Sequence, residues 1–373
     1  TSIITRRLRN NYELTGRKQQ MFWTILLPLL CLVGLAVAAG LIYRAYRQNE
    51  HRQSLKIKVP PGIQESTFVR VGGIDQFVSI RGEDLANPVL LVLHGGMATS
   101  YLSLAPLFQG WERHFTMVQW DRRGVGKTYG RNGRAGSGEM TLERIVEDGI
   151  ELSDYLRRRL GKAKLVLLGH SMGSMIGITM AARRPDLFHA YVGTEQIVDT
   201  ARNETVSYRM MLERVRADGN RKAIGTLERI GEPPYGRLRD WGAKQRIAEI
   251  ADPAYGRLAK GLLGLLLSSP AYSLKDIFDF IGAQLFCGSK LYEQWMQFDA
   301  RRLGSSYATA IFIIQGKADV MTPTELVEAW LKDVDAPRKE FVPIEGGGHL
   351  VMLTAADAYL DALLARVRPH AAA

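Results

Sequence analysis

Cysteine is scarce in this chain. Its 373 residues include two cysteines, Cys31 and Cys287, which are too few for a disulfide framework or for a metal centre built on cysteine ligands. The sequence also lacks internal repeats, low-complexity tracts and the motifs of zinc fingers or RNA-binding domains. These absences favour an ordinary globular protein, and the 46% hydrophobic and 23% charged residues agree with that interpretation.

Negative charge is scarce near the N-terminus. The formal net charge is +11, but residues 1–58 contain ten Lys and Arg residues against Glu13 and Glu50, so this segment carries +8 of it. The rest of the chain is therefore near neutral. A basic excess confined to one end does not indicate a nucleic-acid-binding surface, and we expect no nucleic acid partner.

Long hydrophobic runs are absent except for one. Residues 21–43 carry no charge, and about 20 apolar residues are enough for a helix to cross a bilayer core. Aromatic residues at both ends, Phe22 and Trp23 and then Tyr43, resemble an aromatic belt. A cleaved signal peptide is the alternative, since Ala36-Val37-Ala38 fits a cleavage site, but the run exceeds the roughly 7–15 residues of a signal core. We predict a retained single-pass anchor in a lipid bilayer.

Charge does not decide the orientation of this anchor. Five Lys and Arg residues precede the apolar run and five follow it within 15 residues, so the positive-inside rule gives no preference. Our interpretation is a single-pass membrane protein with the rest of the chain on the extracytoplasmic side. The pairs Gly34/Ala38 and Ala36/Gly40 have the spacing of small residues that permits helix pairing, so a homo-oligomer stays open.

Beyond the apolar run, strand-like and helix-like patterns alternate. Two short alternating runs joined by Gly72-Gly73 predict a β-hairpin over residues 66–80. Later runs are apolar on both faces, as the strands of a parallel sheet buried between helices must be. The order predicts a doubly wound α/β fold, with a mostly parallel central sheet flanked by helices. The expected strands are 88–94, 115–120, 163–169, 190–194, 310–316 and 339–344, and the expected helices are 141–160, 172–184, 323–333 and 354–367.

One region interrupts this alternation. Residues 196–305 are rich in Arg, Glu, Leu and Ala, show no convincing strand, and are typical of several helices inserted as a cap over the strand ends. The predicted organisation is a basic N-terminal segment (1–20), a transmembrane helix (21–43), a juxtamembrane linker (44–64), an α/β core (65–195 and 306–373) and a helical cap (196–305).

A serine stands between two glycines where one apolar run ends. Gly169-His170-Ser171-Met172-Gly173 is a G-x-S-x-G motif that follows a predicted strand and precedes a predicted helix. Side chains at positions 169 or 173 would collide with the neighbouring strand and helix. We therefore expect a sharp turn that pushes the Ser171 hydroxyl out of the sheet edge, as in a nucleophile elbow. The alternative is that this serine only caps the helix that follows.

A serine nucleophile needs a base and an acid that orients it. Six of the seven histidines lie in the linker, in the tail, before strands or in other turns, whereas His349 follows the last strand in the glycine-rich loop 346–349. Asp319 follows the preceding strand, and the order Ser, Asp, His is that of hydrolases with this elbow. Asp199 is the alternative acid.

An oxyanion must be stabilised by N–H donors held in place before the reaction. The backbone N–H of Met172, directly after the nucleophile, is one candidate. The second candidate comes from the turn after residues 88–94, where Gly96 is preferred and Gly95 is its neighbour.

At these residues the sequence resembles a known family. The segments VLHGG, WDRRGVGKT, GHSMGSMIG, QGKADVMTP and EGGGH are similar to those of the α/β-hydrolase fold, and most closely to its proline-iminopeptidase-like branch, over about residues 66–368. The resemblance implies a triad of Ser171, Asp319 and His349 and an oxyanion hole of Gly96 and Met172. Peptidases of this branch bind a substrate amine with cap glutamates, and Glu195 and Glu204 are the equivalents here.

The chain departs from that branch at three places. The usual HGGPG is HGGMA here, the residue after the nucleophile is methionine where the branch often has tryptophan, and DQRG is replaced by DRRG. These changes spare the chemistry but weaken the case for a proline-selective peptidase.

These observations predict a membrane-anchored serine hydrolase that forms an acyl-enzyme on a small-molecule ester or a short peptide, without a metal or cofactor. An aminopeptidase, a lipase and a ligand-binding receptor with little turnover stay open as alternatives.

Overall fold

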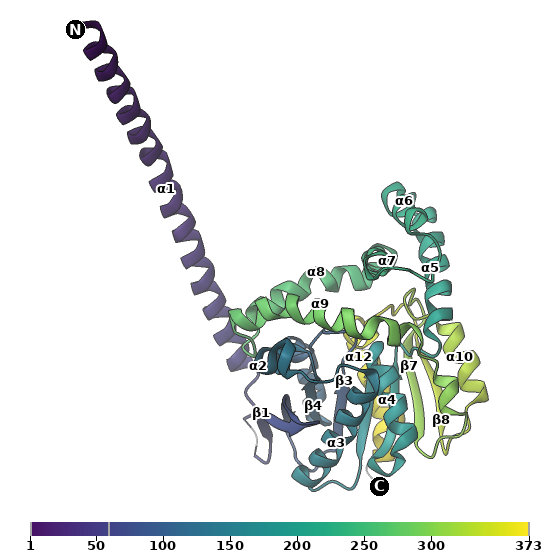
Figure 1. Cartoon of the computed structure of the whole chain (residues 1–373). Helices are drawn as coiled ribbons and strands as arrows, with labels where there is room; N and C mark the ends of the chain where they lie inside the picture. Colours follow the sequence, from purple (N-terminus) through teal and green to yellow (C-terminus); the bar gives the residue numbers. More distant parts are fainter. Residues whose placement is uncertain (1, 59, 372–373) are drawn as a thin grey trace. The chain divides into compact units, whose positions relative to one another are not determined.

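The computed structural model describes residues 2–58 and 60–371, with side chains from Phe22 onward. The chain separates into two compact units, Thr1–Gln53 and Ser54–Ala373. The first unit consists of helix α1 (Ser2–Ser54), drawn in purple in Figure 1. Within Phe22–Ser54 the most apolar stretch has a mean hydropathy of 2.8 and is not buried, so this helix is long and apolar enough to cross a membrane. A signal sequence near an N-terminus shares these properties.

The structure differs from the sequence prediction just after the apolar run. Residues 44–54, assigned to a linker, are the last part of α1. Positions 41–54 contain no proline or glycine, and side-chain pairs one turn apart stabilise the helix. Arg44 donates to Gln48 at 3.3 Å, and Arg47 forms an ion pair with Glu50 at 2.6 Å. The connection to the second unit is therefore short.

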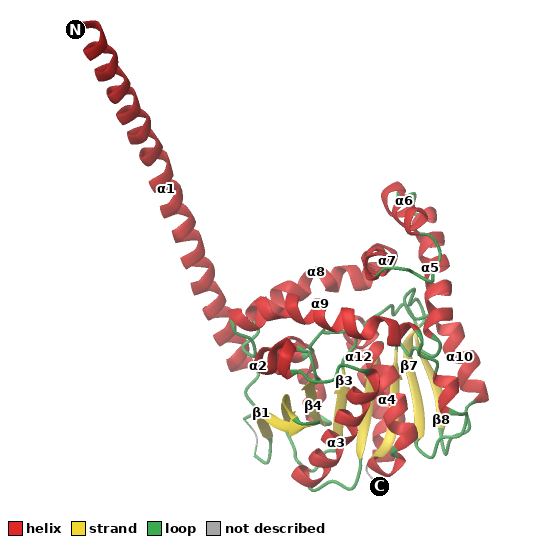
Figure 2. Cartoon of the chain, in the orientation of Figure 1, coloured by secondary structure: helices red, strands yellow, loops and turns green. Residues whose placement is uncertain are grey.

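The second unit is built on an eight-stranded sheet, with strands in yellow in Figure 2. Its order is β1-β2-β4-β3-β5-β6-β7-β8. Strands β1 and β2 form the predicted hairpin, with Val71 opposite Ile74, and β2 is antiparallel to β4. The six strands β3 to β8 are parallel to one another, so their carboxyl ends meet at one edge of the sheet. The strands are β1 (Ile63–Val71), β2 (Ile74–Gly82), β3 (Val89–Leu93), β4 (Thr116–Asp121), β5 (Leu165–His170), β6 (Phe188–Thr194), β7 (Ala310–Gly316) and β8 (Lys339–Ile344).

Both faces of the sheet are covered, which explains why its central strands are apolar throughout. Alternate residues of β3 point to opposite sides: Leu91 joins one buried cluster and Leu90 joins the other. Helices α3 (Leu142–Leu160), α4 (Met172–Arg183) and α10 (Thr324–Asp333) contribute to the first cluster. The 3-10 helix η1 (Leu102–Arg113), α12 (Ala356–Ala362) and the π-helix η4 (Leu363–Val367) contribute to the second. The shorter elements are α2 (Gly126–Gly136), η2 (Pro185–Leu187), η3 (Ala300–Leu303), α11 (Val351–Thr354) and α13 (Arg368–Ala371).

Five α-helices lie between β6 and the short helix η3 that precedes β7, and they form the cap. They have a small apolar core of their own, which includes Met211, Leu227 and Ile247. Figure 1 shows α8 and α9 running side by side above the sheet. The cap helices are α5 (Thr200–Ala217), α6 (Arg221–Ile230), α7 (Leu238–Ala251), α8 (Pro253–Ser268) and α9 (Leu274–Met296).

Candidate active site

Ser171 occupies a strained turn between β5 and α4. Its backbone angles are φ 50° and ψ −120°, in a region that residues other than glycine rarely adopt. Three hydrogen bonds hold this conformation. The Ser171 N–H donates to the Thr194 carbonyl at 2.9 Å, and the Ser171 carbonyl accepts from the Ser174 N–H at 2.8 Å and from the Ser174 hydroxyl at 2.6 Å. The serine therefore has the backbone of a nucleophile elbow.

The two glycines of the motif have the steric role that the sequence suggested. A Cβ atom at position 169 would lie 2.6 Å from the Gly173 carbonyl oxygen, on α4. A Cβ atom at position 173 would overlap the carbonyl oxygen of Leu93, on β3. Strand, turn and helix can approach this closely because neither position carries a side chain.

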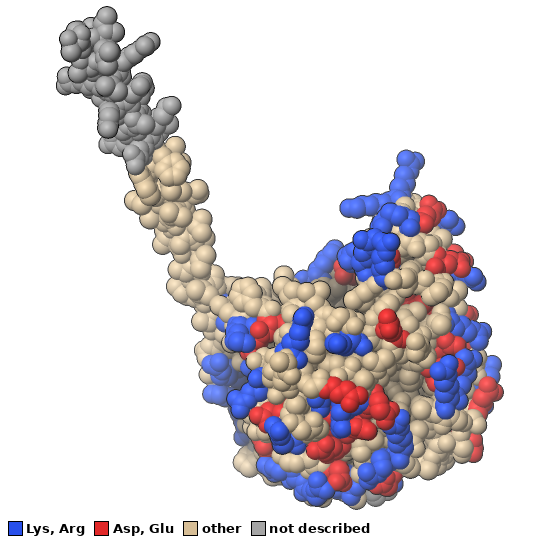
Figure 3. All heavy atoms as spheres, viewed as in Figure 1, with Lys and Arg blue, Asp and Glu red and all other residues tan. Residues whose placement is uncertain are grey.

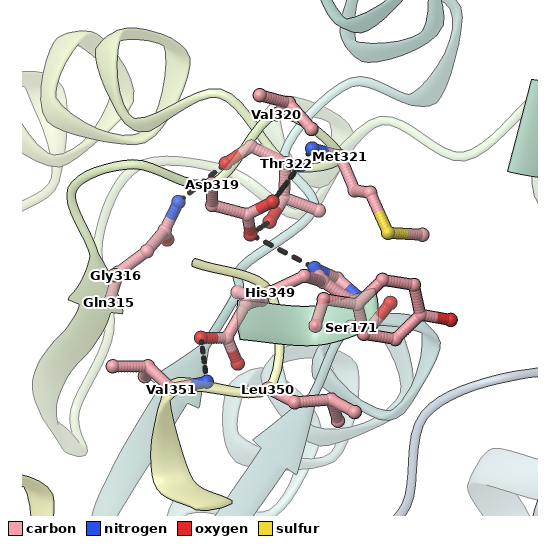
Figure 4. Close-up of polar contacts among 12 residues, drawn as sticks. Ser171, Gln315, Gly316, Asp319, Val320, Met321, Thr322, His349, Leu350 and Val351 are labelled. Atoms are coloured by element: carbon pink, nitrogen blue, oxygen red, sulfur yellow. Dashed lines mark hydrogen bonds and ion pairs between the residues drawn. The ribbon is translucent and has the colours of Figure 1, made fainter. Parts of the chain in front are cut away.

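Asp319 and His349 form a hydrogen-bonded pair at the same edge of the sheet. Asp319 follows β7 and His349 follows β8, and the His349 Nδ1 lies 2.9 Å from the Asp319 Oδ2 (Figure 4). Asp319 is buried, and its Oδ1 accepts hydrogen bonds from the backbone N–H groups of Met321, at 2.7 Å, and Thr322, at 3.1 Å. The carboxylate is thereby fixed in the orientation that a neutral imidazole needs if its free Nε2 is to act as a base.

The alternative acid, Asp199, has a different place. It caps the N-terminus of α5 by accepting from the Arg202 N–H at 3.0 Å, and it forms an ion pair with Arg301 at 2.6 Å. The structure thus brings Asp319, and not Asp199, to the imidazole of His349.

Ser171 and His349 line the same cavity, whose volume is about 390 Å³. Among the described residues no hydrogen bond joins the Ser171 hydroxyl to the His349 ring. In ligand-free hydrolases this contact often forms only when substrate binds. The wall of the cavity is mainly apolar, and its larger side chains include Leu238, Trp241, Leu262, Trp295 and Met321.

The candidate oxyanion donors also border this cavity. Met172 begins α4, and Gly95 and Gly96 lie in the turn after β3, with Gly96 in the left-handed region at φ 64°. Arg122, after β4, fixes this turn: it donates to the His94 carbonyl at 2.7 Å and also to the carbonyl of Gly96. Burial lowers the pKa of Arg122 to about 10, which still leaves it charged at neutral pH.

Glu204 lines the cavity, but it already has a cationic partner. Its Oε2 accepts from the Lys244 ammonium at 2.6 Å, and both side chains are buried. Lys244 comes from α7, whereas Glu204 comes from α5. An ammonium group of the chain thus already pairs with the carboxylate that the resemblance assigned to a substrate amine.

Glu195 differs from the sequence expectation because it lies beneath the site and is not among the residues that line the cavity. It directly follows β6, with φ 46°, and is fully buried. Its Oε1 accepts from the Val351 N–H at 3.2 Å, and its Oε2 lies 3.0 Å from the His170 Nε2 without hydrogen-bond geometry. Burial, followed by the charge of Asp319, raises the pKa of Glu195 well above its usual range. Glu195 therefore supports the loop after His349 through its contact with Val351.

Strained backbone is concentrated around this site. In the described chain the residues other than glycine with positive φ are Ser171, Glu195 and Leu350. Two directly follow a strand, and the third directly follows His349. Such strain persists only where surrounding contacts over-determine it, and it clusters at functional sites.

The sequence reasoning missed Asp252, Arg122 and Tyr101. Asp252 caps α8 by accepting from the Tyr255 N–H at 3.0 Å, and its other oxygen accepts from the His349 N–H at 2.7 Å. Asp followed by Pro253 is a visible capping signal, but it does not reveal the second contact. Tyr101 lies 2.6 Å from the His170 Nδ1 through its hydroxyl and supports the turn below the serine. Within the described residues, no cluster of His, Cys, Asp and Glu is arranged to hold a metal ion.

Comparison with known proteins agrees with this geometry. Residues 88–229 match the family model of the α/β hydrolase fold. The chain has the α/β hydrolase fold. This hydrolase is 27% identical to a probable aminopeptidase, YbaC, of Bacillus subtilis, over 80% of this chain and 95% of that protein.

Solved structures resemble the hydrolase in fold. A proline iminopeptidase-related protein from Thermus thermophilus has a TM-score of 0.54 at 18% identity, over 83% of this chain and 99% of that one. A membrane phospholipase A, described as a bacterial virulence factor, has the same TM-score and identity, over 91% of this chain and 98% of that one. The α/β hydrolase fold predicted from the motifs is thus confirmed, and a proline iminopeptidase of Saccharolobus solfataricus, 28% identical over 32% of this chain and 36% of that protein, agrees with the resemblance to that branch.

Proposed function

We propose that this hydrolase is a serine hydrolase that cleaves an ester or amide bond through an acyl-enzyme. The observation that carries the proposal is the strained Ser171 turn, which opens into the same cavity as the Asp319–His349 pair. A structural serine gains nothing from a strained backbone, whereas a nucleophile gains exposure and access to a base.

The proposed reaction uses the groups already described. His349 takes the proton of the Ser171 hydroxyl as its oxygen attacks the carbonyl carbon, and Asp319 stabilises the imidazolium that forms. The negative charge that develops on the carbonyl oxygen faces the N–H groups of Met172 and Gly96, each contributing roughly 3 kcal/mol to lowering the barrier. His349 then returns the proton to the leaving group, and water releases the acyl group from Ser171.

The substrate that fits best has an apolar acyl group without a positive charge near the scissile bond. Trp241, Trp295 and Leu262 offer an apolar wall, while Lys244 neutralises the carboxylate of Glu204. An aminopeptidase is the second candidate, and the relationship to the probable aminopeptidase supports it. In that case the substrate ammonium must share Glu204 with Lys244.

The anchor is part of the proposal. We infer that α1 stays attached and holds the hydrolase at a bilayer, because its uncharged run is longer than a signal core and the helix continues without interruption to Ser54.

A fluorophosphonate probe tests the nucleophile directly. The full chain should be labelled, and Ser171→Ala should abolish the labelling. Ser289→Ala is a matched control, because its hydroxyl contacts only its own helix, at the Phe286 carbonyl. Absence of labelling in the folded wild-type protein favours the receptor alternative, and labelling that survives Ser171→Ala refutes the assignment of the nucleophile.

A substrate panel separates the two hydrolase candidates. Faster turnover of short-chain ester dyes than of proline-aminoacyl dyes supports the esterase, and the reverse order supports the aminopeptidase.

A further inference from the structure

One side of the cap carries an unusual apolar surface. Among the described residues of Ser54–Ala373, the large apolar side chains that are more than half exposed all lie on α8 and α9. They are Leu263 (61% exposed), Phe278 (74%), Ile281 (63%) and Leu285 (63%). Single exposed apolar residues are ordinary, but four on two adjacent helices form a patch that water does not favour.

The spacing on α9 shows that the exposure has a direction. Leu274, Phe278, Ile281 and Leu285 recur at intervals of three and four residues, so they form a stripe along one face of the helix. On the other side of the same helix, Ala283, Phe286 and Cys287 are buried in the core. On α8, the neighbouring residues Leu262 and Leu263 differ in the same way, because Leu262 lines the cavity and Leu263 is exposed.

Cations lie on the helix beside this stripe. Arg257 and Lys260 on α8 are exposed, and they form no ion pair among the described residues. The acidic residues in the first two turns of α9 are neutralised: Asp276 pairs with Lys127 at 3.0 Å, and Asp279 pairs with Lys275 at 2.5 Å. Figure 3 shows Lys and Arg side chains in blue beside the uncharged surface in this part of the cap. Apolar side chains flanked by free cations are the composition of a helix that lies in a lipid interface.

Along the sequence, the second unit begins soon after the apolar run ends. That run ends at Tyr43 and the second unit begins at Ser54, so about 11 helical residues, or about 16 Å, separate them. Leu55 is already buried, and its carbonyl accepts a hydrogen bond from Arg81. With α1 in a bilayer, this tether leaves little room for the globular unit to leave the membrane surface.

We propose that the stripe of α9 and the adjoining end of α8 form a second membrane contact that inserts into the headgroup region of a phospholipid bilayer. The partner is the bilayer itself, because the free cations suit phosphate headgroups and the aliphatic and aromatic side chains suit the acyl boundary. The contact concerns where the cap binds and not which bond is cleaved, so it is independent of the proposed nucleophile.

A fluorescent label on the stripe tests the contact in the full chain. An environment-sensitive nitrobenzoxadiazole dye is attached to Ile281→Cys in a Cys31→Ser background, since Cys287 is buried. The protein is reconstituted into vesicles of phosphatidylcholine and phosphatidylglycerol that contain lipids with nitroxide-labelled acyl chains. Ala163→Cys, in the exposed turn before β5 at the opposite edge of the sheet, is the matched control site.

We expect blue-shifted emission and several-fold stronger nitroxide quenching at position 281 than at position 163. Phe278→Glu should move the emission at 281 toward that of a dye in water, whereas Phe278→Leu should not. Equal, weak quenching at both sites overturns the proposal. Energy transfer between labels on different copies, without quenching by lipid, also overturns it, because the stripe then contacts a second copy of the chain.

Discussion

The backbone N–H of His349 donates a hydrogen bond of 2.7 Å to the side-chain carboxylate of Asp252. Asp252 belongs to the cap, at the start of α8, and His349 belongs to the core, in the loop after β8. The residue that we propose as the base is therefore held by both parts of the second unit. A movement of α8 relative to the sheet changes the position of the imidazole as well as the shape of the cavity.

This contact makes Asp252 a positioning residue. Asp252→Ala should lower kcat roughly 10²-fold with a small change in KM, because it displaces the base while leaving the cavity wall in place. The steady-state kinetics of ester hydrolysis measure this split between kcat and KM.

Asp199→Ala is the control for Asp252, since Asp199 also caps a cap helix but does not contact His349. Each substitution should lower stability by about 1 kcal/mol through the lost cap. Equal losses of kcat in both variants would mean that Asp252 acts only through the stability of the cap.

The orientation of the imidazole depends on the charge of Asp319. Asp319→Asn preserves the shape of the side chain but replaces an acceptor facing Nδ1, so the wrong tautomer of His349 is stabilised. We expect a fall in kcat of roughly 10⁴-fold, with fluorophosphonate labelling slowed in parallel. Asp357→Asn, at an exposed position on α12, should leave both unchanged. A loss of less than about tenfold in Asp319→Asn would contradict the proposed role.

Replacing only one partner of the buried Glu204–Lys244 ion pair should lower the free energy of unfolding. Glu204→Gln leaves the Lys244 ammonium buried without a counter-charge and should destabilise the unit by about 3–5 kcal/mol. The double variant Glu204→Gln/Lys244→Met should recover most of that loss, because no charge remains buried. Chemical denaturation of the wild type, the single variant and the double variant measures this recovery, and a double variant as unstable as the single one refutes this account.

The same pair predicts how the cavity discriminates against amines. Lys244→Met frees the Glu204 carboxylate, so turnover of an aminoacyl dye with a free amine should rise roughly tenfold or more relative to its N-acetylated form. Measuring kcat/KM for both dyes gives this ratio in each protein. An unchanged ratio would show that Glu204 does not face the amine of the bound substrate.

A buried carboxyl at the end of β4 predicts a pH effect on stability. Burial raises the pKa of Asp121 to about 6, against an ordinary value of 3.8. The folded state therefore binds the Asp121 proton more tightly than the unfolded state does. Protonation of Asp121 stabilises the fold, and this stabilisation is complete below about pH 4. That advantage is lost as the pH rises through about 6, at a cost of roughly 3 kcal/mol.

Asp121→Asn isolates this contribution, because an amide oxygen can still accept from the Lys127 N–H, which lies 2.7 Å from the carboxylate. The variant and the wild type should be similarly stable at pH 4, and the variant should be the more stable protein at pH 8. Thermal unfolding midpoints at both pH values test this, and a constant difference between the two proteins is the contrary result.

Local patterns were enough to predict the framework of the site. The strands around Leu91 and Leu167 could be recognised because strands buried on both faces must be apolar throughout. Ser171, Asp319 and His349 could be selected because each follows such a strand, and parallel strands bring their carboxyl ends together.

Pairings between distant segments could not be predicted in this way. Nothing in the local sequence of Glu204 indicates that Lys244 lies against it, and nothing around Asp252 indicates His349, because these contacts depend on how the cap helices pack. The prediction that Glu195 binds the substrate failed for a similar reason. Its position after β6 could be recognised in the sequence, but the direction in which its strained backbone points the side chain could not.

The hydrogen bonds from Arg122 to the carbonyls of His94 and Gly96 affect which residues the turn after β3 can accept. The conformation of that turn is imposed from outside, by a guanidinium on a neighbouring strand end, and does not depend on a ring-constrained residue within the turn. Position 97 is therefore free to vary in size and shape, and Met97 is an adjustable part of the cavity wall.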